Sequence, residues 1–148
     1  MASRKNFEVV NGDALRNVLL AAEEVASESV LRQAAVAGAR VIHAEVQLRA
    51  PVATVLFEGR KRKHPPGFLR KNIIIAYDDD ESVPGKLASY LVTWTKEAYY
   101  GRFVEFGTSN MAAQPFLRPG FEAKKRAAAA AVDEVIQRKA KELMSGNR

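Results

Sequence analysis

The amino-acid sequence predicts an α+β fold, in which a long N-terminal helical region and a C-terminal helix pack on a small antiparallel β-sheet with long hairpin loops. Residues 13–48 and residues 119–143 both carry apolar side chains at helical spacing. Between them, two short runs are rich in β-branched and aromatic residues. We therefore expect one domain that spans residues 1–148.

Length and composition limit the kinds of protein this chain can be. Its 148 residues suffice for one domain with a buried core, and 47% hydrophobic with 27% charged residues is ordinary for a globular fold. The absence of cysteine excludes disulfides, thiolate metal sites and cysteine nucleophiles, and it suits a reducing cytoplasm. No apolar run is long enough to predict a transmembrane helix or a secretory signal. We expect flexible ends at about residues 1–6 and 144–148.

The N-terminal region predicts one long helix or two abutting helices over residues 13–48. A short strand is expected before it at residues 7–10, and Asp13 is a candidate N-cap, because its carboxylate can accept hydrogen bonds from the N–H groups of the first turn. The apolar stripe weakens around Ser27–Ser29, which marks the place for a break, and Pro51 stops the helix. The stripe consists of Leu15, Val18, Leu19, Ala22, Val25, Ala26, Leu31, Ala34, Ala35, Gly38, Val41 and Ile42.

A basic loop follows at about residues 52–71, and its Pro-Pro-Gly sequence at 65–67 predicts a loop or the tip of a hairpin. His64 is expected in solvent beside it. The net charge of +6 and the isoelectric point near 9.7 suit an anionic neighbour, or only aid solubility. The cations of this loop either extend into solvent, meet an acidic surface on another subunit, or face phosphates. They are Arg60, Lys61, Arg62, Lys63, Arg70 and Lys71.

An antiparallel hairpin is expected next, from the β-rich runs Asn72–Tyr77 and Ala88–Thr95. The segment between them holds four consecutive acids, Asp78–Glu81. These acids could in principle bind a divalent metal, but they lack the glycine and the later glutamate of a calcium loop. We interpret them as a solvated acidic turn.

An aromatic-rich segment at residues 99–122 is the most constrained part of the chain. From Glu97 the pattern is helical for about two turns, and Gly107 is placed to end that helix in a left-handed conformation. Pro119 suits the first turn of an amphipathic closing helix that runs to about Leu143. The rings of the segment are interpreted first as core residues. They are Tyr99, Tyr100, Phe103, Phe106 and Phe116.

No catalytic constellation accompanies this segment. The sequence contains no glycine-rich phosphate loop, no metalloprotease motif and no nucleophile elbow, so we expect no cofactor and no metal. His43 is expected to be a partly buried structural residue. Glu105 could act as a general base, but no partner acid or nucleophile lies near it in sequence. The favoured interpretation is structural, with its carboxylate accepting hydrogen bonds from turn N–H groups or from Thr108 and so locking the Gly107 turn.

The same stretch, YYGRFVEFGTSNMAAQPFLRPGFE, resembles the tail-completion, or head–tail joining, proteins of long-tailed bacteriophages, the gene-product-ten-like family of phage Hong Kong 97. Upstream, LRAPVAT and GFLRKNIII extend the resemblance, which covers roughly residues 7–143. The segment between Pro51 and Gly67 is longer and more basic than is usual there, and Gly120 stands where a small helix former is usual. The most specific positions are Tyr100, Phe103, Val104, Glu105, Gly107, Thr108, Pro115, Phe116, Leu117, Arg118 and Pro119.

The resemblance implies a non-enzymatic structural protein of a phage or prophage neck or tail. It implies a ring, commonly six-fold, around the DNA channel, with copies of itself and neighbouring neck, portal-side or tail-tube proteins as partners. Such a protein resides in the virion, and in the host cytoplasm during assembly, without a membrane. The basic residues Arg60–Lys63 would then touch genomic DNA non-specifically or dock on an acidic neighbouring surface.

Two other functions stay open at this point. A small sequence-independent nucleic-acid-binding protein would act through the basic loop, because phosphate contacts need no base readout. A hydrolase would use Glu105 or the acids at 78–81.

Overall fold

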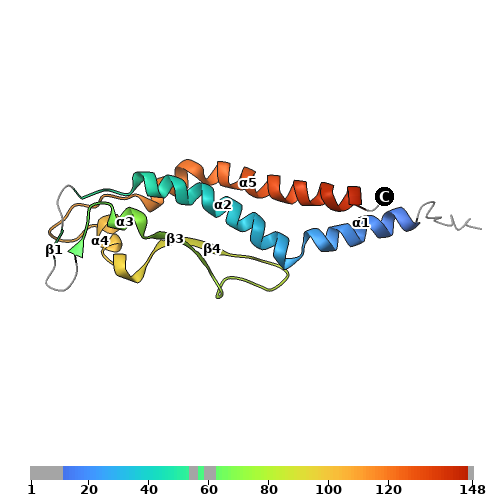
Figure 1. Cartoon of the computed structure of the whole chain (residues 1–148), viewed down its shortest axis with the longest axis horizontal. Helices are drawn as coiled ribbons and strands as arrows, with labels where there is room; N and C mark the ends of the chain where they lie inside the picture. The colour runs from blue at the N-terminus through green and yellow to red at the C-terminus, as the bar shows by residue number, and fades with distance from the viewer. Residues whose placement is uncertain (1–11, 54–56, 59–62, 147–148) are drawn as a thin grey trace, which may run out of the picture.

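The computed structural model describes residues 12–53, 57–58 and 63–146 of the chain. The elements are α1 (Gly12–Val25), α2 (Glu28–Arg49), β1 (Phe57–Glu58), β2 (Lys63–His64), α3 (Phe68–Lys71), β3 (Ile73–Tyr77), β4 (Tyr90–Trp94), the 3₁₀ helix η1 (Lys96–Ala98), α4 (Gly101–Phe106) and α5 (Leu117–Gly146). It is an elongated molecule in which two long helices run side by side, β1, α3 and α4 gather at one end, and the β3–β4 strands extend from that end along α2 (Figure 1). We call that end the head end and the opposite one the α1 end.

The predicted α+β class is confirmed, and the helical N-terminal region consists of two helices. They are separated at Ala26 and Ser27, and Ser27 has an extended backbone with φ −60° and ψ 149°. Helix α1 begins at Gly12, so Asp13 lies inside the first turn rather than at the N-cap, where its charge still suits the positive end of the helix dipole. Helix α2 ends at Arg49, before Pro51. The strand expected at residues 7–10 lies outside the described residues.

Helices α2 and α5 pack closely because glycines lie at their contact. A Cβ atom on Gly38 of α2 would lie 2.8 Å from Val132 Cγ2 and 3.3 Å from the carbonyl oxygen of Ala128. A Cβ atom on Gly120 of α5 would lie 2.7 Å from Val46 Cγ2. Distances under 3 Å would force a shift of the neighbouring side chain, so glycine at positions 38 and 120 lets the two helices approach without that shift.

Strands β3 and β4 form the predicted antiparallel hairpin, with Ile73 opposite Trp94 and Tyr77 opposite Tyr90. The hairpin packs on α2, and His43 is half-buried there with its Nε2 2.7 Å from the carbonyl oxygen of Ile73. One detail differs from expectation: α5 packs along α2, and not along the sheet (Figure 1). Two strands about 4.8 Å apart cover roughly the width of one helix, so a second helix has no room on that face.

The acidic connection between β3 and β4 forms hydrogen-bonded turns. The Ser82 hydroxyl donates to the Asp78 carbonyl and accepts from the Ser89 N–H at 2.9 Å. Val83 pairs with Leu87 around Gly85, whose φ is +70°. Asp79, Asp80 and Glu81 are exposed. Among the described residues, no three acidic or histidine side chains are close enough to hold a metal ion.

The basic loop is partly regular. Strands β1 and β2 pair in antiparallel fashion, and Arg60–Arg62 at their turn lie outside the described residues. The expectation of a loop up to residue 71 is wrong for Phe68–Lys71, which form helix α3 after a turn at Gly67 with φ +80°. The closing helix α5 continues to Gly146, so the expected flexible end is helical at 144–146. No helix in the described part of the chain is long and apolar enough to cross a membrane.

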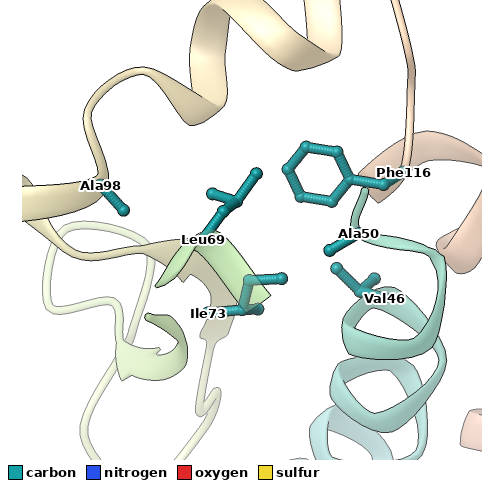
Figure 2. Close-up of a cluster of buried hydrophobic side chains, with 6 residues drawn as sticks. All are labelled: Val46, Ala50, Leu69, Ile73, Ala98 and Phe116. Atoms are coloured by element: carbon teal, nitrogen blue, oxygen red, sulfur yellow. The ribbon is translucent and has the colours of Figure 1, made fainter. Parts of the chain in front are cut away.

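The hydrophobic core lies at the head end (Figure 2). Phe116 is its largest fully buried side chain, and the ring centroid of Trp94 lies 6.1 Å from that of Phe116. Six side chains drawn from α2, α3, β3, η1 and the segment entering α5 make this cluster, and they are Val46, Ala50, Leu69, Ile73, Ala98 and Phe116. Because segments far apart in sequence all contribute to it, this core holds the head end together.

Candidate functional site

The predicted helix before Gly107 is present as η1 followed by α4, and Gly107 ends it. Its φ of +74° is a conformation that residues with side chains rarely adopt, and its N–H donates to the carbonyl of Phe103 at 2.8 Å. A Cβ atom at this position would lie 2.8 Å from the backbone nitrogen of Ala113. Gly107 therefore allows the chain to reverse closely against residues 111–113.

Glu105 lies beneath this reversal with only 6% of its surface exposed. One carboxylate oxygen, Oε2, accepts hydrogen bonds from the N–H groups of Phe116 at 2.7 Å and Leu117 at 3.0 Å. The other, Oε1, accepts from the N–H of Arg118 at 3.1 Å. The carboxylate of α4 thus caps the N-terminus of α5, and the two helices are joined by charge-assisted hydrogen bonds.

The Glu105 carboxylate satisfies all the N–H groups at the start of α5 that have no hydrogen-bond partner within the helix. The first four N–H groups of an α-helix have no partner within the helix. With Phe116 as the capping residue, three of these groups donate to Glu105, and the fourth position is Pro119, which has no N–H. The first helical bond then runs from Gly120 N to the Phe116 carbonyl at 3.2 Å. We call Glu105, Gly107 and residues 116–119 the α4–α5 clamp.

The clamp differs from the expected lock of the Gly107 turn. The Glu105 carboxylate contacts the start of α5, whereas the Thr108 hydroxyl accepts from the N–H of Asn110 at 3.3 Å. Thr108 and Pro115 are exposed. The three bonds occupy both oxygens of Glu105, and the nearby groove lined by Phe103 and Phe106 does not include this residue. The geometry thus favours a structural role over that of a general base.

The expectation that all five aromatic rings are core is wrong for three of them. Phe116 is fully buried and Tyr100 half-buried, but Tyr99, Phe103 and Phe106 are exposed. Helix α4 has only six residues and rests on the core through one face, which carries Tyr100 and Val104. The other three rings belong to the remaining faces of the helix and of the turn before it.

Tyr100 also contacts the paired strands β1 and β2 of the basic loop, which we call the basic hairpin, through His64 at the end of β2. The His64 ring lies 4.7 Å from that of Phe68 and 5.1 Å from that of Tyr100, centroid to centroid. His64 is 8% exposed, so its expected place in solvent is wrong; the aromatic rings on both sides bury it. Burial raises the pKa of the Tyr100 phenol, although a hydrogen bond with the Leu69 backbone acts in the opposite direction.

The predicted DNA- or partner-facing cations do not form one uniform surface. The Arg70 guanidinium donates to the carbonyls of Leu48 at 3.2 Å and Ala50 at 2.8 Å, so it caps the C-terminus of α2 within the fold. This use departs from the outward role expected for it. Lys71 is exposed, Lys63 lies in β2, and Arg60–Arg62 lie outside the described residues.

Sequence reasoning identified the residues of the clamp but not their partners. A buried acid eleven residues before a helix start is not a known capping spacing, so only the folded chain shows the contact. One signal was available, because Pro119 removes one N–H at that helix start and leaves a single carboxylate enough oxygen atoms for the others. The role of Arg70 had no such signal.

The sequence matches a known protein family over more than half of its length. Residues 13–107 match the profile of a family described as "Bacteriophage HK97-gp10, putative tail-component". The match runs from α1 through α4 and includes Tyr100, Glu105 and Gly107, and it stops before residues 115–119. The chain belongs to this family of phage tail components. Searches of curated proteins and of solved structures gave no significant match.

Proposed function

We propose that this chain is a non-enzymatic structural subunit of the phage neck or the top of the tail. Copies of it form a ring, with six-fold symmetry as the working expectation, around the channel through which the genome passes. The subunit is made in the host cytoplasm and carried in the virion. Membership of the tail-component family over residues 13–107 is the observation that carries this proposal.

The head end suits a role in which a subunit transmits force between neighbours. Glu105 joins α4 to α5 through three hydrogen bonds, and Arg70 joins α3 to the end of α2. The first contact joins two consecutive helices, and the second joins segments about 20 residues apart in the chain. His64 at the end of β2 packs against the rings of Phe68 and Tyr100, and these contacts attach β2 to the head end.

Within the ring, Arg60–Lys63 contact the phosphates of the genomic DNA or an acidic surface of a portal-side or tail-tube protein. Phosphate contacts would be non-specific in sequence and sensitive to salt, since they gain from counterion release. Lys71 is exposed and remains available to such a partner, whereas Arg70 is engaged within the fold. A charge-driven contact with an acidic protein would show a similar salt dependence but would not need DNA.

The test is a complementation assay in a phage or prophage that lacks this gene. The four residues Arg60–Lys63 are changed together to glutamate, and filled heads, free tails and joined particles are counted by negative-stain electron microscopy. We expect unjoined heads and tails from this variant. The matched control carries the same change of charge at exposed cations elsewhere, and those are Lys86, Arg126, Arg138 and Lys141.

Three results would count against the proposal. Normal joining of heads and tails by the Arg60–Lys63 variant would contradict the proposed contact of these residues with DNA or with a neighbouring protein. Absence of the protein from purified wild-type particles would remove the structural role itself. A monomer that binds duplex DNA tightly in moderate salt and never enters particles would instead favour a small nucleic-acid-binding protein.

A further inference from the structure

Helix α1 leaves an apolar face uncovered. Leu15, Val18 and Leu19 are 53%, 54% and 57% exposed, and no residue of α1 is buried by the described part of the chain. Only Ala21 and Val25 are half-buried. A helix of 14 residues is marginal in water unless an apolar face is packed. We call Leu15, Val18 and Leu19 the α1 face.

A second apolar surface lies at the opposite end of the molecule, on and beside α4 (Figure 1). Tyr99, Phe103 and Phe106 are 58%, 45% and 74% exposed, and the rings of Tyr99 and Phe103 meet edge to face at 6.4 Å. We call these three residues the α4 patch. Phe103 and Phe106 line a shallow groove of about 420 Å³, together with Arg102, Gly107 and Thr108. Contiguous exposed aromatic residues next to an arginine are typical of protein interfaces.

We propose that the α1 face of one copy binds in the groove at the α4 patch of the next copy. Both surfaces are apolar, and a helix laid into an apolar groove is a common mode of recognition. Their charges are complementary, because α1 carries three acids and one base, Asp13, Glu23, Glu24 and Arg16, while Arg102 is the charged residue that lines the groove.

The same charges favour this pairing over symmetrical ones. Two α1 helices packed face to face would place the acids of both in one interface, and two α4 patches would place two copies of Arg102 in one interface. The two surfaces lie at opposite ends of one elongated chain, so they meet only between copies (Figure 1). A contact between unlike surfaces is heterologous, and repeated copies then close into a ring or extend as a filament.

This inference rests on the self-assembly in the proposed function and adds to it the two faces that meet. The chain has no cysteine, so single cysteines can be placed without competing thiols. The variants Leu19→Cys and Phe103→Cys change exposed residues. Each is treated with a short bis-maleimide alone and after mixing, at concentrations where light scattering shows wild-type oligomers, and products are resolved on denaturing gels.

The expected result is a cross-linked dimer in the mixture and none from either variant alone. The double variant should give a ladder of oligomers. The control replaces Leu19→Cys by Ala129→Cys, an exposed position of α5 outside both surfaces, and should give no dimer with Phe103→Cys.

The other outcomes overturn the inference and separate it from the proposed function. Dimers from Leu19→Cys alone, or from Phe103→Cys alone, would indicate a symmetrical contact. Wild-type rings in micrographs without a cross-link in the mixture would place the contact elsewhere and leave the ring intact. A chain that stays monomeric at every concentration, and in purified particles, would overturn both the pairing and the ring.

Discussion

The two ends of this molecule are built in opposite ways. At the head end, Phe116 and Val46 are fully buried, and the acid Glu105 is buried with its oxygens occupied by three N–H groups. At the α1 end, a whole helix has no buried residue, and Leu19 is more than half exposed. Both ends come from segments whose apolar residues are spaced for burial.

The difference indicates that one end of the chain provides stability within a single copy and the other provides surface for contact with a neighbour. The head end has a buried core of its own and satisfies the N–H groups at the start of α5, so it is stable within one copy even though the α4 patch on its surface is exposed. The α1 end keeps apolar surface that the described part of the chain leaves uncovered, and it is the part of the fold whose order should depend on assembly.

The largest difference in stability should appear when one large apolar side chain is truncated to alanine at each end of the molecule. Phe116→Ala should lower the free energy of unfolding by about 3–5 kcal/mol, because it empties a fully buried ring site. Leu19→Ala should change it by less than about 0.5 kcal/mol in the isolated chain. Urea unfolding followed by circular dichroism measures both. Equal losses for the two variants would break the comparison.

A second effect should come from the buried carboxylate. Glu105→Ala should cost about 2–4 kcal/mol of unfolding free energy, because three N–H groups at the start of α5 lose their acceptor. Glu105→Gln retains one acceptor oxygen, so its loss should be smaller, about 1–2 kcal/mol. Hydrogen exchange of the Phe116 and Leu117 amides should accelerate in step. An Ala variant with wild-type stability, which also joins particles normally, would contradict the clamp.

Replacing Gly107 should lower stability for two reasons, its positive φ and the close approach of residues 111–113. Gly107→Val should cost about 2–3 kcal/mol, because a positive φ is combined with a Cβ 2.8 Å from a backbone nitrogen. Gly85→Val is the matched control, since Gly85 also has a positive φ but nothing within 4 Å, and we expect about 1 kcal/mol. Thermal melts of both variants measure the difference, which would vanish if the crowding at Gly107 were unimportant.

The smallest effect is on the pH dependence of stability. Burial raises the pKa of Tyr100 in the folded state, so the neutral phenol is the form that folding favours. Its contribution is complete below the unfolded pKa of about 10 and is lost as pH rises through the folded value. Between about pH 9 and pH 11, stability should therefore fall more in the wild type than in Tyr100→Phe. Identical pH profiles for the two proteins would show that this ring is not buried.

Local patterns in the sequence predicted the helices, the β3–β4 hairpin and the glycine that ends α4, because each depends on neighbouring residues. The break near Ser27 and the helix start near Pro119 were also predicted from local patterns. His64 and Arg70 were predicted to face solvent or a partner because they lie in a basic, proline-rich segment. The burial of His64 against Tyr100 and the hydrogen bonds of Arg70 to the end of α2 depend on tertiary contacts, which no local pattern records.

The sequence by itself determined the class of fold, the order of its elements and the family, because spacing and turn residues act over a few positions along the chain. Tertiary structure decided which apolar faces are covered and which N–H groups donate hydrogen bonds to Glu105. Whether Val104 packs on the core and Phe106 is exposed depends on which side of the six-residue helix α4 meets the core. That choice is made by segments distant in the chain, because burial is a property of the whole packed arrangement rather than of a residue and its neighbours.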